Sequence, residues 1–119
     1  MSTHSHLMET FNNIGFYLVE TENMNIGDDP TDYNICETYR YNSPNLKDSH
    51  YTLIVYKYTR GEINIENISI DYRLYIHSNL DGKYIDSPFQ TSNMNYVNVK
   101  IQELFPYEMR NIIISNILS

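Results

Sequence analysis

The stretch Leu104-Phe105-Pro106-Tyr107 decides how the later part of this 119-residue chain folds. Around it, apolar residues recur every four positions and polar residues fall elsewhere on the helical wheel, which predicts an amphipathic helix. The apolar positions are Val97, Ile101, Phe105, Met109, Ile113 and Ile117. Proline lacks an amide donor and disfavours helical geometry in the residue before it. We therefore predict one long helix with a kink or break near Phe105, capped at its start by Asn93 or Asn95.

Four strand-like runs precede this helix. They cover residues 11–19, 34–41, 50–59 and 68–77. Turn-forming residues separate them, as in the stretch 25–32, and residues 79–87 are expected to end the sheet. The fourth run alternates most clearly, with Ile70, Tyr72 and Leu74 on one face, whereas the third carries apolar residues on both faces and is expected to be covered on both. The sequence therefore predicts an α+β fold, a four-stranded antiparallel sheet followed by one long, Pro-kinked C-terminal helix. The short run 97–101 also fits a strand, because both periods match so few residues.

The composition limits the partners and the location. The chain has 15 acidic and 8 basic residues and a formal net charge of -7, so nucleic acids and anionic membranes would repel it. It has one cysteine, Cys36, no leader of signal-peptide type, and no apolar run approaching the roughly 20 residues that cross a bilayer. We expect a cytoplasmic protein in which residues 1–9 form a flexible N-terminal tail and residues 10–119 form a single domain.

No constellation of residues indicates an enzyme, a metal site or a cofactor site. Cys36 has no histidine near it in the sequence, and the four glycines are isolated, so no phosphate-binding loop is predicted. His4 and His6 alone are too few ligands for a metal. The 12 tyrosines are unusual, and tyrosine suits binding surfaces, although AT-rich codon usage would enrich it too. We expect a protein with no catalytic residues, no metal and no cofactor.

Three segments are similar to segments of one known family. They are Phe11-Asn12-Asn13-Ile14-Gly15-Phe16-Tyr17, the run from Leu46 to Val55, and Leu104-Phe105-Pro106-Tyr107 with Arg110 and Ile113-Ile114-Ser115 after it. The last segment matches a Leu-Phe-Pro-Tyr-x-x-Arg pattern, and its place behind four strands makes the match more specific. On these residues the chain resembles the SecB family of export chaperones, from about Thr10 to Leu118.

The resemblance implies a SecB-like sheet packed by helices, assembly into a homodimer or homotetramer, and binding of unfolded polypeptide along an apolar groove without nucleotide. The candidate polypeptide contacts, each also suited to a core or dimer contact, are Phe16, Tyr39, Tyr41, Tyr56, Tyr58 and Phe89. The candidates for oligomer or helix packing are Leu104, Phe105, Pro106, Tyr107, Met109 and Ile113. Glu20 and Glu22 are the candidates for acidic contacts with a partner protein.

The family's second helix and its metal-binding tail have no counterpart in the sequence, which leads us to expect a shortened relative. Two functions follow as hypotheses. The first is a non-enzymatic SecB-like chaperone or polypeptide-binding protein that holds unfolded or partner chains on an apolar surface. The alternative is an acidic immunity or anti-defence inhibitor, of phage or plasmid type, that blocks one folded partner.

Overall fold

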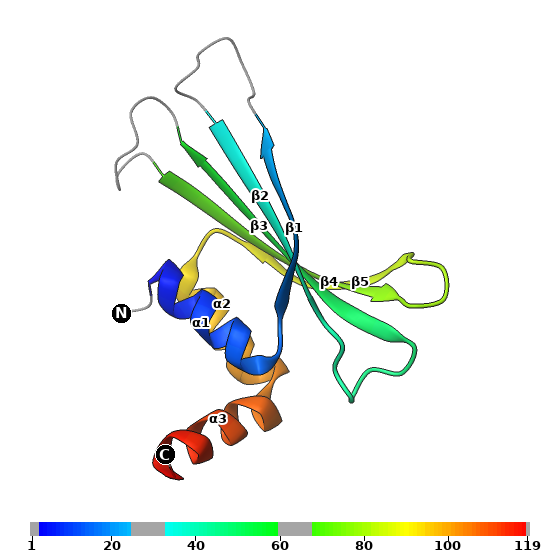
Figure 1. Ribbon diagram of the computed structural model, residues 1–119, viewed down its shortest axis with the longest axis vertical. Coiled ribbons are helices and arrows are strands. Elements are labelled where there is room, and N and C mark those ends of the chain that lie inside the picture. The colour runs from blue at the N-terminus through cyan, green and yellow to red at the C-terminus, as the bar shows by residue number, and fades with distance from the viewer. Residues whose placement is uncertain (1–2, 25–32, 60–67, 119) are drawn as a thin grey trace.

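The computed structural model describes residues 3–24, 33–59 and 68–118, which form a five-stranded antiparallel sheet and three helices (Figure 1). In chain order the elements are α1 (His4–Ile14), β1 (Tyr17–Met24), β2 (Tyr33–Tyr41), β3 (Ser49–Thr59), β4 (Ile68–Ser78), β5 (Tyr84–Thr91), α2 (Met94–Leu104) and α3 (Pro106–Leu118). The strands lie in the sheet in chain order, each antiparallel to the next. The predicted α+β class is confirmed, whereas the predicted numbers of strands and helices are wrong.

Helix α1 occupies most of the predicted tail and half of the first predicted strand. The Thr3 side chain accepts a hydrogen bond from the His6 amide and so caps the helix. Leu7, Phe11 and Ile14 follow at helical spacing, and all three are buried. A flexible tail over residues 1–9 is therefore wrong for the part that α1 covers. The predicted strand at residues 11–19 is wrong as far as Tyr17, where β1 begins.

The middle of the sheet matches the prediction, and its last strand does not. Strands β2, β3 and β4 coincide with the predicted runs to within one residue at each end. Residues 79–87 do not end the sheet, because β5 pairs with β4 in a register that places Phe89 opposite Leu74. Pro88 is tolerated because β5 is an edge strand, where a missing amide donor costs less than in an inner strand. The predicted loop at residues 25–32 lies outside the described residues.

The helices pack on one face of the sheet and cover only part of it (Figure 1). Leu53, Val55, Tyr72 and Leu74 point towards the helices and are fully buried, together with Leu7 of α1 and with Val97 and Ile101 of α2. These side chains occupy every second position of β3 and β4, and the register pairs Leu53 with Leu74 and Val55 with Tyr72, so they lie on one face of the sheet. The alternation in β4 predicts such a face. The prediction that β3 is covered on both faces is wrong. On its other face Tyr56 is only partly buried and Tyr58 is 44% exposed.

The predicted break at the proline is confirmed, but it separates two helices rather than kinking one. Phe105 has φ -126° and ψ 49°, outside the helical region, and it ends α2 just before Pro106 begins α3. Asn93 is the N-cap of α2. Residues 97–101 lie within this helix, so the alternative of a short strand there is wrong. The apolar stripe is buried only as far as Phe105, and Ile113 further along is 54% exposed.

Candidate polypeptide-binding surfaces

The six predicted polypeptide contacts divide between the core and the sheet face that lies opposite the helices. Phe16, Tyr41 and Phe89 are at most 9% exposed and belong to the core. Their position fits a core contact, which was the alternative to a polypeptide contact. Tyr39 is partly buried against the same core. Tyr56 and Tyr58 alternate with the buried residues of β3 and lie on the opposite face.

We call this surface the open face. It comprises Tyr17, Glu20 and Glu22 of β1, Arg40 of β2, His50, Thr52, Ile54, Tyr56 and Tyr58 of β3, Arg73, Tyr75 and His77 of β4, and Tyr84 of β5, which cross-strand pairing places side by side. The Arg73 guanidinium lies 4.6 Å from the centre of the Tyr56 ring and bonds the Asp71 carboxylate at 2.8 Å. A cavity of about 380 Å³ opens beside Tyr56, Tyr58 and Arg73. The open face thus presents half-buried aromatic rings together with oriented charges.

A second group of polar side chains lies where β2 ends and β3 begins. The His50 and His77 rings, on directly opposed residues of β3 and β4, stack with centroids 5.9 Å apart. His50 Nδ1 lies 2.6 Å from the Asn79 amide oxygen, which also accepts a hydrogen bond from Arg40 Nη2 at 3.3 Å. Burial, and then the neighbouring charge of His50, lower the pKa of His77. Three basic side chains therefore meet here around a neutral amide.

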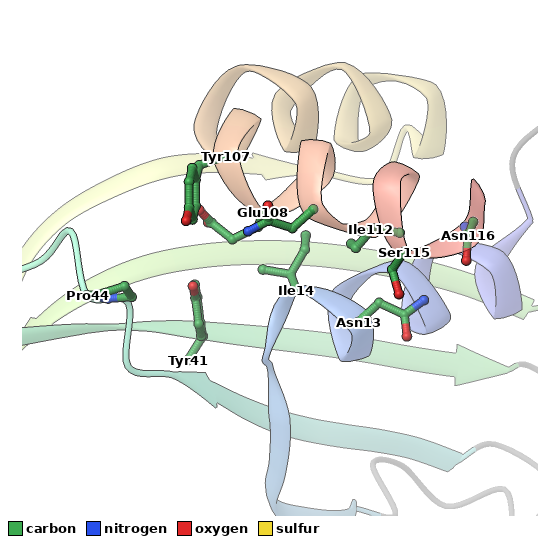
Figure 2. A pocket seen from close by; sticks show the side chains of 10 residues that line it. Asn13, Ile14, Tyr41, Pro44, Tyr107, Glu108, Ile112, Ser115 and Asn116 are labelled. Carbon is green, nitrogen blue, oxygen red and sulfur yellow. The ribbon is translucent and has the colours of Figure 1, made fainter. Parts of the chain in front are cut away.

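The helical side of the molecule holds a larger pocket, of about 520 Å³, between the end of α1, the loop after β2, and α3. Figure 2 shows the Tyr41 hydroxyl pointing from the sheet towards Tyr107 and Glu108 of α3, beside Ile14 and Ile112. Burial raises the pKa of Tyr41, and the Glu108 carboxylate adds to this effect. The pocket is lined by both polar and apolar groups, with Asn13 and Glu108 beside Ile14 and Ile112.

Helix α3 exposes an apolar surface. Its exposed members are Tyr107 (61%), Ile113 (54%), Ile114 (46%) and Ile117 (75%). Of the other residues predicted to pack, Phe105 lies in the core, Leu104 and Met109 contact it from its margin, and Pro106 is exposed. The residues predicted to pack therefore lie on two different surfaces, one inside the molecule and one exposed to solvent.

Edge strand β1 carries the two predicted acidic contacts. Glu20 and Glu22 are exposed and lie opposite Thr38 and Cys36 on the open face. Burial raises the pKa of the Cys36 thiol, and the two carboxylates raise it further, which holds the thiol protonated at neutral pH. The edge also exposes Leu18 (52%).

A polar cluster under the start of α1 was missed by the sequence analysis. His4 Nδ1 lies 2.8 Å from the hydroxyl of Tyr72, a fully buried residue whose pKa is raised by burial to about 12. Burial lowers the pKa of His4, and the charge of Lys57 lowers it further. Lys57 itself bonds Glu37 at 2.7 Å. The missed signal was Leu7, whose spacing from Phe11 extends the helical pattern back to His4.

The described residues contain no group of three or more His, Cys, Asp or Glu side chains placed to hold a metal ion. Within the same residues, no helix has the length and apolar character needed to cross a bilayer. No protein-family model, curated protein or solved structure matches the chain.

Proposed function

We propose that this protein is a non-enzymatic, SecB-like polypeptide-binding protein of the cytoplasm that holds an unfolded or partner chain on the open face of its sheet. The observation that carries the proposal is the set of partly exposed tyrosines on this face, which no described element covers. Tyr58 and Tyr84 are 44% and 59% exposed, and Tyr56 and Tyr75 lie between them across β3 and β4. Tyrosine rings bind diverse apolar side chains and lose little conformational freedom in doing so.

The sheet also offers main-chain contacts to an extended polypeptide. Strands β1 and β5 are its two edges, and an edge strand has one row of amide and carbonyl groups without a partner strand. Addition of a chain to such an edge uses main-chain hydrogen bonds and is therefore tolerant of sequence. Exposed apolar residues such as Leu18 on β1 and Ile85 on β5 would contact alternate side chains of the bound segment.

Assembly into a homodimer or homotetramer is part of the proposal and is assigned to α3. Ile113, Ile114 and Ile117 would lose their contact with water in an assembly. The test compares Ile113→Lys with Val99→Lys on α2, since the two residues are 54% and 53% exposed. Size-exclusion chromatography with light scattering should show an oligomer for the wild type and for Val99→Lys, and the mass of a single chain for Ile113→Lys. A monomeric wild-type protein would remove assembly from the proposal.

The binding test uses a similar pair of tyrosines. Tyr58 on the open face is 44% exposed, and Tyr96 on α2, away from that face, is 45% exposed. In light-scattering assays with a chemically denatured client, the wild type and Tyr96→Ser should slow aggregation. Tyr58→Ser should need roughly five to ten times more protein for the same effect, as when a binding tyrosine worth about 1 kcal/mol or more is removed. If the wild type has no effect at stoichiometric excess, or if both variants behave alike, the open face does not hold clients.

A second candidate function is favoured by the exposed carboxylates of Glu20 and Glu22 on edge strand β1. An acidic immunity or anti-defence inhibitor, of phage or plasmid type, would use them to contact one basic, folded partner. A pull-down would then recover a single stable partner, and its affinity would fall steeply with salt and with the double change Glu20→Gln and Glu22→Gln. Salt-insensitive binding to many unfolded chains would instead favour the first function.

A further inference from the structure

Three basic side chains of the open face lie close together where β2 ends and β3 begins. We propose that Arg40, His50 and His77, here called the basic cluster, bind a carboxylate of the polypeptide held on the open face, either its C-terminal carboxylate or an Asp or Glu side chain. The inference rests on the proposed function and adds a charge preference to it.

The first argument is the pairing of the cations. Lys57, Arg73 and Lys100 each form an ion pair with a carboxylate of the chain. Like Lys47, Lys83 and Arg110, Arg40 forms none within the described part of the chain. It donates instead to two amide oxygens, from Nε to Asn42 at 3.0 Å and from Nη2 to Asn79 at 3.3 Å. These bonds orient the guanidinium without neutralising it, so its other donors can form the two-pronged contact that carboxylates favour.

The second argument is the orientation of the histidines. An amide oxygen only accepts hydrogen bonds, so His50 must donate from Nδ1 to Asn79. Nε2 of His50 is then the ring nitrogen that remains for contact with an anion. His77 Nδ1 lies 3.0 Å from the Thr52 hydroxyl, which holds the second ring beside the first. Burial, and then the charge of His50, lower the pKa of His77, and a bound carboxylate would favour the charged form of the His77 ring.

The third argument is the charge distribution along the open face. Tyr17, opposite Arg40, accepts a hydrogen bond from Asn42, which ties β1 into the same group. Further along β1, Glu20 and Glu22 make that part of the face acidic. The protein as a whole would repel an acidic peptide, so a local basic cluster selects where along the open face a carboxylate can lie. We therefore expect a bound chain to be oriented with its acidic part at the basic cluster.

The test measures fluorescence anisotropy of labelled short apolar peptides binding to the full-length protein. One pair of peptides differs only in a C-terminal carboxylate or amide, and a second, amidated pair differs only in an internal Glu or Gln. The wild type should bind the carboxylate member of at least one pair roughly tenfold more tightly, and the pair showing the effect identifies the source of the anion. Arg40→Gln should abolish the preference. The control Arg110→Gln on α3, which removes the same charge elsewhere, should keep it.

The preference should also grow as the pH falls below about 6.5, because His77, whose pKa is lowered by burial and then by the charge of His50, becomes protonated there. The other titratable groups facing them are Arg40, Tyr75 and Tyr84. Circular dichroism confirms that each variant is folded. His77→Gln is a second variant that should flatten the pH dependence. The inference is overturned if the two members of each peptide pair bind equally, or if the preference survives Arg40→Gln. In either case the proposed function still stands. If no peptide binds at all, the proposed function fails and the inference fails with it.

Discussion

Replacing Phe105 with alanine tests whether the junction between α2 and α3 holds the helices on the sheet. The Phe105 side chain is 1% exposed, and its ring meets Phe16 at 5.8 Å, Tyr51 at 5.0 Å and Tyr41 at 6.1 Å, each close to an edge-on contact. Truncation of a buried phenylalanine costs about 3–5 kcal/mol. Edge-on aromatic pairs contribute about 0.5–1.5 kcal/mol beyond area burial, so we expect a loss towards the upper end, about 4–5 kcal/mol.

The assay is urea unfolding followed by far-UV circular dichroism, at one protein concentration because assembly adds stability. With an m value of about 2 kcal/mol/M, the midpoint for Phe105→Ala should fall by about 2 M. The control is Val99→Ala on α2, outside the surface of α3 that is assigned to assembly, where the side chain is 53% exposed and the change should stay within about 0.5 kcal/mol. A loss below about 1 kcal/mol for Phe105→Ala would refute the argument that this residue joins the helices to the core.

Three further predictions concern glycine, helix capping and pH. Gly15→Ala should lower the free energy of unfolding by about 2 kcal/mol or more, because φ is +132° and a Cβ atom would lie 2.7 Å from the Tyr41 ring. Gly82→Ala is the control in the same urea assay: φ is +71° and the space around it is open, so the loss should be only about 1 kcal/mol. Asn93→Ala should cost about 1 kcal/mol, because its side chain accepts two amide hydrogen bonds at the start of α2, and Asn93→Ser should recover most of the loss. Burial lowers the pKa of His4, so the unfolded chain takes up this proton at a higher pH than the folded one. The stability that His4 contributes should therefore be fully present above about pH 6.5 and be lost as the pH drops below that value. His4→Gln should make the thermal midpoint fall less over this pH range. An equal fall in the wild type and the variant would contradict the role given to His4.

The central part of the fold could be predicted because its residues alternate. In β4, buried Tyr72 and Leu74 alternate with Asp71 and Arg73, a pattern that only a strand with one covered face explains. The break before Pro106 follows from local geometry alone, and so does the cap at Asn93. These features depend on near neighbours in the chain, which the sequence displays directly.

The ends of the sheet could not be predicted in this way. Helix α1 is anchored by Leu7 within a mostly polar start, and the burial of Leu7 comes from contacts with elements far along the chain. In β5 the exposed Tyr84 and Ile85 do not alternate, and irregular pairing with β4 interrupts the register. The open face was equally hidden, since a tyrosine such as Tyr58 looks like Tyr41 until the packing of the helices separates surface from core.

The order of the strands affects how the chain folds during its synthesis. Each strand pairs with the one that precedes it, so the sheet can grow one strand at a time as the ribosome releases the chain. Its apolar face is completed only when α2 and α3 follow, because Val97, Ile101 and Phe105 cover the same core as Phe11 of α1. Until then the nascent sheet exposes Leu53 and Leu74. The nascent protein would therefore pass through a stage in which it needs protection from aggregation.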